Sequence, residues 1–328
     1  MATESLVGKT LSHYKITRSL GAGGMGVVYE AEDSKLGRRV AVKFLSGDLQ
    51  QDAPMLERFQ REARAASSLN HPGICTVHAI EQHEGQFFIV MELLEGESLK
   101  DLLRRIKRIT VPLAMDILLQ ACRGLEYAHE RGIIHRDVNP DNLFLLSGNR
   151  LKILDFGLAC PSGTEDINLA GTAAYMSPEQ IEGEAVSPRT DVYGLGAVAF
   201  EMLTGSKPFR GETTQEILNL HLTEDIPDPA TLLPEISSEL REFVQTAARR
   251  DPERRYPSVR HALEALRPLA ERLDVTGRHV PARPRKMSNL LLFYPEEQQV
   301  ALKSLMEEFS AKAQELGADL RIADFQAP

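Results

Sequence analysis

A glycine-rich segment near the N-terminus has the residue types and the spacing to hold phosphate groups. It follows a G-x-G-x-x-G-x-V frame between two β-type runs, and its glycines are Gly21, Gly23, Gly24 and Gly26. Because glycine has no side chain, such a backbone can close over phosphate oxygens. A dinucleotide-binding fingerprint has the same glycines but continues as a helix, whereas Val27–Ala31 continues as a strand. A glycine-rich hairpin without a ligand is the other alternative for this segment.

A lysine follows on the next predicted strand. Lys43 ends the apolar run Val40–Val42, at the distance expected of a strand adjacent to the glycine-rich one. Most lysines are simply solvated, but a cation at the end of a buried run needs an anionic partner, since an unpaired charge is costly away from water. The glycine segment and Lys43 together therefore indicate a site for an anion.

Two further motifs lie in the middle of the chain. Residues 135–142 read H-R-D-V-N-P-D-N, and D-F-G follows at 155–157, thirteen residues after Asn142. This order resembles the catalytic loop and the metal-binding segment of eukaryotic-type protein kinases. Matches at 171–179 and 191–196 extend the resemblance over about residues 13–272, and the chain looks most like the bacterial serine/threonine protein kinases.

The resemblance implies a role for each polar residue of these motifs. Asp137 would accept or orient the substrate hydroxyl, and Asn142 and Asp155 would bind Mg²⁺. Lys43 would hold the α and β phosphates of ATP and pair with a helical glutamate, here Glu62. Phosphoryl transfer depends more on neutralising charge than on covalent chemistry. The implied cofactors are therefore ATP and Mg²⁺, with Mn²⁺ as an alternative metal.

The resemblance also implies where the nucleotide binds. Residues 88–94 stand where kinases link their two lobes, so their backbone would hydrogen-bond the adenine edge, with Met91 at the back of the pocket. An ordinary buried strand is the alternative for these residues. The implied nucleotide-binding residues are Gly21, Gly23, Gly24, Gly26, Val28, Ala41, Lys43, Met91, Glu92, Leu94 and Phe144.

One position departs from the family pattern. Serine/threonine kinases normally carry lysine two residues after the catalytic aspartate, where this chain has Asn139. Asparagine offers amide donors but no positive charge, and loss of one preorganised transition-state donor typically costs roughly 10² to 10³ in rate. We therefore expect a serine/threonine kinase, with Asn139 among the catalytic residues and activity reduced. The alternative is an ATP-binding pseudokinase or signalling scaffold.

Other motif residues have implied structural or regulatory roles. Glu179 is expected to pair with Arg255, Asp191 to brace the catalytic loop, and His135 and Phe156 to pack as supports.

Arg136, next to Asp137, is typical of kinases whose activation segment is ordered by a phosphate on that segment. The candidates are Ser162 and Thr164, and Thr164 is favoured because it lies eight residues before Thr172. Thr172 stands where serine/threonine kinases contact the catalytic aspartate.

The surrounding patterns predict the elements that must position these residues. Short β-type runs and one helix, near 55–69, fill about residues 13–92, and amphipathic helices dominate about 95–272. Both β-type pairs flanking the catalytic motifs are short. We therefore expect an α+β, bilobal protein-kinase fold with a small β-rich lobe and a larger helical lobe. The predicted strands are 14–20, 27–31, 40–45, 74–82, 86–92, 143–146 and 151–153, and the predicted helices include 98–106 and 112–131.

The two ends of the chain are predicted to lie outside the kinase domain. Residues 1–12 read as a tail, 273–288 as a basic, proline-containing linker, and 289–328 as a β-α-β segment. A β-α-β unit cannot bury both of its faces alone. It is expected to pack on the kinase lobe, to form a homodimer, or to begin a larger domain.

Composition narrows the remaining partners. The net charge of -9 argues against a general nucleic-acid surface, and three dispersed cysteines suggest a reducing compartment. The longest apolar run, near 192–203, is too short to span a membrane, and the N-terminus has no signal pattern. A cytoplasmic enzyme acting on serine or threonine of a protein substrate is expected.

Overall fold

The computed structural model describes residues 6–23, 26–45, 63–156 and 173–275. The chain divides into two units, residues 1–282 and 283–328, and only the first contains described residues. The predicted β-α-β segment and most of the predicted linker lie outside the described residues, as do residues 55–62 of the predicted helix near 55–69.

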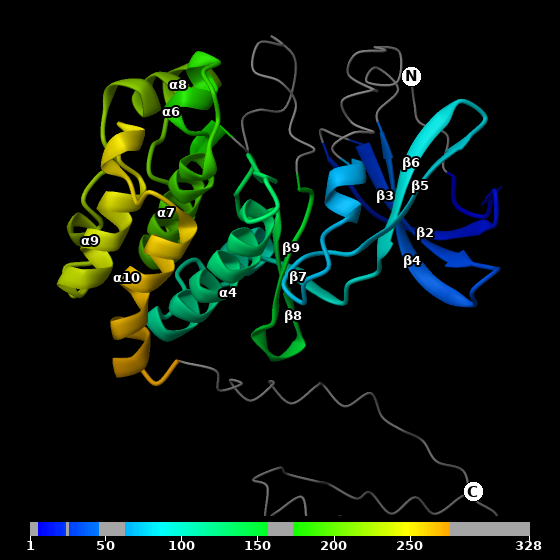
Figure 1. The fold of residues 1–328 in the computed structure, drawn as a ribbon, viewed down its shortest axis with the longest axis horizontal. Helices are drawn as coiled ribbons and strands as arrows, with labels where there is room; N and C mark the ends of the chain where they lie inside the picture. The colour runs from blue at the N-terminus through cyan, green and yellow to red at the C-terminus, as the bar shows by residue number, and fades with distance from the viewer. Residues whose placement is uncertain (1–5, 24–25, 46–62, 157–172, 276–328) are drawn as a thin grey trace, which may run out of the picture. The chain divides into compact units, whose positions relative to one another are not determined.

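The N-terminal part is one antiparallel sheet (Figure 1). Its strand order is β1-β2-β3-β4-β6-β5, so β4 pairs with β6 and not with the next strand in sequence. Residues 63–67, between these two strands in sequence, are helical. The strands are β1 (Thr10–Leu11), β2 (Tyr14–Gly23), β3 (Gly26–Asp33), β4 (Arg38–Leu45), β5 (Val77–His83) and β6 (Gln86–Glu92).

The two faces of this sheet differ because successive side chains of a strand point to opposite faces. One face packs a hydrophobic cluster of Tyr14, Ile16, Tyr29, Val40, Val42, Phe44, Phe88 and Val90. The other face carries the alternate residues of β3, β4 and β6. The register places Val28 opposite Lys43 and Ala41 opposite Met91, so these four residues share the second face.

The C-terminal part is mainly helical (Figure 1). Its core is a large apolar cluster centred on α4 and α7. A small sheet of β7 (Gly96–Ser98), β8 (Leu143–Leu146) and β9 (Leu151–Ile153) carries the catalytic motifs. The helices are α3 (Leu99–Ile106), α4 (Val111–His129), α6 (Pro178–Glu182), α7 (Pro188–Thr204), α8 (Thr214–Thr223), α9 (Ser238–Ala247) and α10 (Val259–Arg272).

Helix α7 is the central helix of this part. Ser187 caps its N-terminus by accepting the N–H of Arg189, and Pro188 occupies the first turn, where its missing N–H costs nothing. Most of the helix is apolar all round and buried, as expected of a core helix. A Cβ on Gly194 would lie 2.9 Å from Val138. Glycine at this position therefore lets α7 approach the catalytic loop closely.

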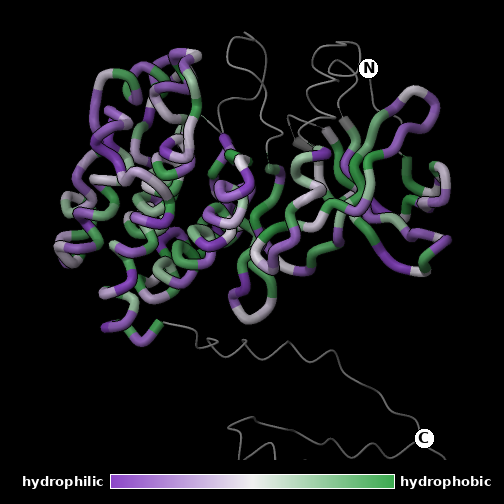
Figure 2. The backbone as a smooth tube through the Cα atoms, viewed as in Figure 1, coloured by the Kyte–Doolittle hydropathy of each residue, from purple (hydrophilic) through white to green (hydrophobic). Residues whose placement is uncertain are grey.

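The sequence patterns predicted most described elements to within a few residues. Figure 2 shows hydrophobic and hydrophilic residues interleaved along them. The predicted strand at 74–82 was wrong at its start, because β5 begins at Val77 and Ile74 instead forms an isolated bridge with Ile153. Ile74 is apolar because it packs in the core of the helical part. Within the described residues, helices are too short or too polar to cross a membrane.

Candidate active site

Asp191, in the first turn of α7, holds the loop between α4 and β8 through hydrogen bonds to its backbone. Asp191 is 1% exposed. Its carboxylate accepts the backbone N–H groups of His135 and Arg136 at 2.8 Å each, and the ring N–H of His129 at 2.6 Å. Arg136 has a φ of +68°, a conformation that costs a non-glycine residue energy unless its surroundings enforce it. The prediction that Asp191 braces this loop is confirmed.

The electrostatics of Asp191 suit a structural role. Burial alone raises the pKa of a carboxyl group, because it penalises the charged form. In Asp191 the hydrogen bonds and charges of His129 and His135 outweigh burial and hold the pKa below its ordinary value. The carboxylate therefore stays ionised as a fixed acceptor.

Asp137 is held at both carboxylate oxygens by neutral amides. Its Oδ1 accepts the side-chain N–H of Asn139 at 2.6 Å, and its Oδ2 accepts that of Asn142 at 2.8 Å. The same Asn142 amide also donates to the backbone carbonyl of Asp137 at 2.9 Å. These contacts fix the carboxylate in one orientation.

The pKa of Asp137 moves in the opposite direction to that of Asp191. Desolvation raises the pKa of this part-buried carboxyl above its ordinary value, and the nearby charge of Asp155 adds to the rise. His135 and the amides of Asn139 and Asn142 oppose the rise without cancelling it. Neutral amides stabilise a carboxylate less than charged donors do. Asp137 is therefore a better proton acceptor than an ordinary aspartate.

Lys43 and Asp155 connect the sheet to the helical part. The Lys43 ammonium donates to Asp155 Oδ2 at 2.7 Å, and the two side chains are 10% and 22% exposed. The predicted partner of Lys43, Glu62, lies outside the described residues. Asp155 has a φ of +53°, so both this aspartate and Arg136 sit in conformations that the surrounding contacts must enforce.

His135 and Phe156 pack against one another as predicted. Their rings meet edge to face at 4.7 Å between centroids. His135 donates from Nε2 to the carbonyl of Leu154 at 2.7 Å and accepts the N–H of Asp137 at Nδ1 at 3.1 Å. These partners fix one tautomer, and they tie the D-F-G segment to the catalytic loop.

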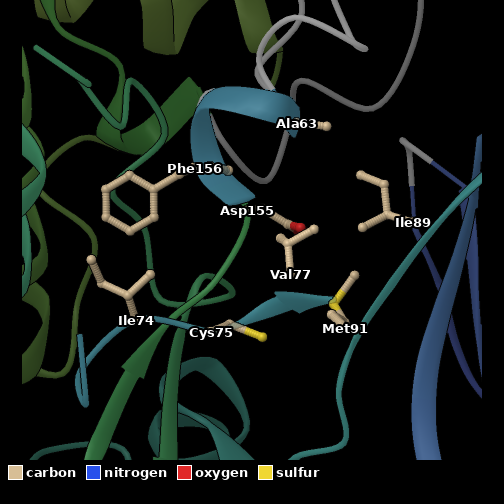
Figure 3. Close-up of a pocket in the computed structure, with 9 residues that line it drawn as sticks. Ala63, Ile74, Cys75, Val77, Ile89, Met91, Asp155 and Phe156 are labelled. Atoms are coloured by element: carbon tan, nitrogen blue, oxygen red, sulfur yellow. The ribbon is translucent and has the colours of Figure 1, made fainter. Parts of the chain in front are cut away.

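A small pocket opens between the sheet and the D-F-G segment (Figure 3). Met91 and Ile89 of β6 lie on one side of it, and Asp155 and Phe156 lie on the other. Cys75 also lines it; burial raises the pKa of its thiol far above the ordinary value, so the thiol is unreactive. The structure thus brings to one pocket Met91, predicted at the back of the nucleotide pocket, and Asp155, predicted to bind Mg²⁺.

Glu92 is engaged through its side chain. Its carboxylate accepts the Lys152 ammonium at 2.6 Å and the Thr76 N–H at 2.7 Å. Burial raises the pKa of Glu92, but these donors outweigh it and hold the pKa below its ordinary value. Sequence reasoning missed Lys152, whose pattern is that of an ordinary strand lysine. Both donors bond Oε1, and the backbone N–H of Glu92 donates to the carbonyl of Thr76 at 2.9 Å.

The remaining predicted nucleotide-binding residues within the described part lie in or beside strands of the two sheets. Gly21 pairs with Val28 across β2 and β3, and a Cβ on Gly21 would meet no atom of the described residues within 4 Å. Gly23 and Gly26 pair at the end of this hairpin. Phe144 lies in β8, opposite Ser98. Leu94 follows β6 and is part-buried.

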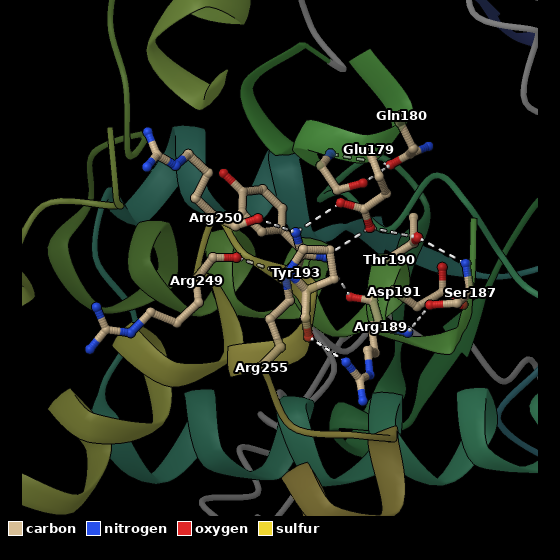
Figure 4. Close-up of polar contacts among 12 residues, drawn as sticks. Glu179, Gln180, Ser187, Arg189, Thr190, Asp191, Tyr193, Arg249, Arg250 and Arg255 are labelled. Atoms are coloured by element: carbon tan, nitrogen blue, oxygen red, sulfur yellow. Dashed lines mark hydrogen bonds and ion pairs between the residues drawn. The ribbon is translucent and has the colours of Figure 1, made fainter. Parts of the chain in front are cut away.

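A second buried polar network joins α6, the first turn of α7 and residues 249–255 (Figure 4). Arg255 donates to both carboxylate oxygens of Glu179 at 2.8 Å each, which confirms the predicted pair. The side chains are 0% and 6% exposed. Burial raises the pKa of Glu179, but Arg255 and the Thr190 hydroxyl outweigh it and hold the pKa below its ordinary value. Arg255 also donates to the backbone carbonyls of Arg189, Arg249 and Arg250.

Gln180, next to Glu179 in α6, bonds the catalytic loop, and sequence reasoning missed this contact. Its amide donates to the carbonyl of Arg136 at 2.7 Å, and its Oε1 accepts the N–H of Ser177 at 3.2 Å. The S-x-x-Q spacing of Ser177 and Gln180 is the sequence signature of a capping box, but no local pattern indicates the contact with Arg136. Several predicted site residues lie outside the described residues, namely Gly24, Glu62, Ser162, Thr164 and Thr172.

Comparison with known proteins gives a consistent result. The family model described as "Protein kinase domain" matches residues 14–266. Serine/threonine-protein kinase PknA of Mycobacterium tuberculosis is 38% identical over 294 residues, which cover 84% of this chain and 68% of that protein. PknB from the same species is 39% identical over 256 residues, covering 75% of this chain and 41% of that protein.

Solved structures agree with these matches. The crystal structure of the Mycobacterium tuberculosis PknI kinase domain superposes with a TM-score of 0.69 at 29% sequence identity, over 82% of this chain and all of that one. A mutant form of the same kinase domain superposes with a TM-score of 0.68 at the same identity.

Proposed function

The chain belongs to the protein kinase family, and on this premise we propose how its own residues transfer the γ-phosphate of ATP to a protein. It is a serine/threonine protein kinase, as are its relatives PknA and PknB. One observation carries the proposal for the site. The Asp137 carboxylate accepts a hydrogen bond at each oxygen, in a loop that Asp191 fixes. Burial raises its pKa, and the nearby charge of Asp155 raises the pKa further.

Asp137 is the residue we assign to the substrate hydroxyl. A carboxylate in this position orients the hydroxyl and can accept its proton. The raised pKa favours proton acceptance, because a base works best when its pKa approaches the working pH. The amides of Asn139 and Asn142 hold the acceptor still, so little of its orientation must be created on substrate binding.

The residues around Asp137 fit ATP and Mg²⁺, which protein kinases use in general. Asp155 and Asn142 offer the oxygen ligands that Mg²⁺ prefers. The Asn142 amide nitrogen is occupied by Asp137, so its Oδ1 is the atom directed to a cation. Bound Mg²⁺ neutralises charge on the phosphates. Lys43 supplies further positive charge, since its ammonium has three donors and can keep Asp155 while binding phosphate.

The second face of the N-terminal sheet is assigned to the nucleotide. Val28 and Ala41 would cover the base, and the backbone after Met91 would hydrogen-bond its edge. This assignment rests on the register, which places Val28, Ala41, Lys43 and Met91 on one face.

Two proposals concern residues outside the described ones. The first is phosphorylation of the chain's own activation segment at Thr164, whose phosphate would pair with Arg136. Phosphopeptide mapping of active protein tests this proposal, and an unmodified segment contradicts it.

The second proposal is a homodimer through residues 289–328. Light scattering before and after their deletion tests it, and an unchanged oligomeric state contradicts it.

The direct test of the function is a phosphoryl-transfer assay. Purified protein is incubated with labelled ATP, Mg²⁺ or Mn²⁺, and a general acceptor protein, beside Asp137→Asn. The parent should label serine or threonine, and the rate of Asp137→Asn should be lower by a factor of about 10² to 10⁴. A parent that binds nucleotide but labels nothing would support the pseudokinase alternative, which at present has no observation in its favour.

A further inference from the structure

Asn139 uses both ends of its side-chain amide within the catalytic loop. The residue is 4% exposed. Its nitrogen donates to Asp137 Oδ1 at 2.6 Å. Its oxygen accepts the backbone N–H groups of Asp141 at 2.8 Å and Asn142 at 3.2 Å. The side chain therefore connects the orientation of Asp137 to the turn that carries Asn142.

The orientation of this amide follows from its partners. Backbone N–H groups can only donate, and an ionised carboxylate can only accept, so the oxygen must face the turn and the nitrogen must face Asp137. Lysine has three donors and no acceptor. A lysine at position 139 could reach Asp137, but it would remove the side-chain acceptor of the Asp141 N–H and leave the Asn142 N–H only the backbone carbonyl of residue 139, at 3.1 Å. Asparagine and lysine would therefore make different sets of hydrogen bonds at this position, because only asparagine has an acceptor.

We propose that Asn139 is a positioning residue that holds Asp137 and the Asn142 turn in register, and that this loop depends on it and not on a lysine charge. The proposal rests on the proposed function, because it concerns the residues assigned to the hydroxyl and to Mg²⁺. It reverses the simple expectation from the family pattern. Restoring lysine should impair this enzyme, because a charge is gained only by losing the brace of the turn.

Three variants separate the two ends of the amide. Asn139→Ala removes both contacts. Asn139→Lys removes the acceptor and adds a charge. Asn139→Asp keeps an acceptor for the turn but replaces the donor to Asp137 with a second carboxylate. The last variant preserves the turn, so it keeps the test valid if Asn139→Ala does not fold.

The first readout is turnover. Asn139→Ala and Asn139→Lys should both lower kcat by about 10- to 100-fold, the size of effect expected when a reacting group is misplaced. A kcat of Asn139→Lys equal to or above the parent value would overturn the proposal and identify the missing charge as the limit.

The second readout is the split between kcat and KM for the acceptor protein, which a general loss of folded enzyme would not move. Asn139 contacts Asp137 and the turn that carries Asn142, so Asn139→Ala and Asn139→Lys should lower kcat and leave KM nearly unchanged. A rise in KM that accounts for the whole loss of kcat/KM would contradict the link to Asp137.

The third readout does not need turnover. Affinity for a fluorescent ATP analogue is titrated with and without Mg²⁺. The Mg²⁺-dependent gain should shrink in Asn139→Ala and Asn139→Lys, because the Asn142 turn loses its brace, and persist in Asn139→Asp. Equal gains in all variants would overturn the proposal. A parent that shows the Mg²⁺-dependent gain in affinity but transfers no phosphoryl group would overturn the proposed function. The comparison of affinities among the variants would still decide the role of Asn139.

Discussion

The catalytic loop and the Glu179–Arg255 network are both tied to α7, yet they treat their carboxylates in opposite ways. Glu179 faces a fully charged, bidentate arginine, and its pKa is lowered. Asp137 is contacted by two neutral amides, and its pKa is raised. The two sites belong to one helical part, and Gln180, the residue after Glu179, donates to the Arg136 carbonyl of the catalytic loop.

The difference separates a carboxylate that holds the fold from the one that we propose accepts the substrate proton. A charged donor favours the ionised form, so the group takes up a proton only at a pH below its ordinary pKa. Amide donors orient a carboxylate while leaving its basicity available. The same lobe therefore contains a fixed anion and a proton acceptor, and the partners of each decide which it is.

The largest expected effect on stability is the loss of Arg255. Arg255→Ala leaves a buried Glu179 charge and several carbonyls without their donor, and it should destabilise the fold by about 3–5 kcal/mol, or roughly 10 °C in melting temperature. Thermal unfolding measures this. The matched control is Arg254→Ala, whose side chain is 76% exposed and which should melt within a degree or two of the parent. Equal melting temperatures for the two variants would contradict a structural role for the pair.

A smaller effect should appear in Glu179→Gln, and it should depend on pH. At neutral pH the loss should be about 1.5–3 kcal/mol, the usual worth of a hydrogen bond to a charged group. Because the folded pKa of Glu179 is lowered, its contribution is present above the ordinary value of 4.5 and is lost as pH falls through the folded value. Urea unfolding of parent and variant between pH 3 and 7 should therefore converge in acid. A difference that stays constant with pH would contradict the lowered pKa.

Asp137→Asn should show the opposite trend with pH. The folded pKa of Asp137 is raised, so its contribution is fully present below the ordinary value of 3.8 and is lost as pH rises through the folded value. The variant should thus gain stability relative to the parent as pH rises, within the roughly 0.5–2 kcal/mol typical of single stabilising changes. The same urea series measures it. A relative loss with rising pH would remove the contrast between the two carboxylates.

The smallest effect is expected at the surface beside the catalytic loop. Lys100 pairs with Asp141 at 2.6 Å, but the side chains are 37% and 53% exposed. Lys100→Ala should cost at most about 1 kcal/mol and should lose its effect at high salt, because exposed charges are screened. Unfolding at low and high ionic strength measures this. A cost comparable to that of Arg255→Ala would show that position in the loop, and not burial, sets the energies.

Much of the fold could be predicted because its signals are local. Alternation in Val40–Leu45 and the helical spacing after Ser98 depend on neighbours in sequence, and the structure places β4 and α3 there. The predicted start of β5 was wrong because Ile74 is buried in the core of the helical part and does not belong to the strand. Lys152 and Gln180 were missed for a related reason, since their partners Glu92 and Arg136 lie far away in sequence.

Residue types and their order were enough to indicate the family and the bilobal fold, and to select Asp137, Asn142, Asp155 and Lys43 as the residues we propose for the site. They did not show which partners each carboxylate would have. The fold decides this, because it pairs Lys43 with Asp155 across 112 residues of sequence and Glu179 with Arg255 across 76 residues. It was decided equally by the direction of the Asn139 amide. A pKa depends on burial and on the nearest charges and donors, and these exist only once the chain has folded.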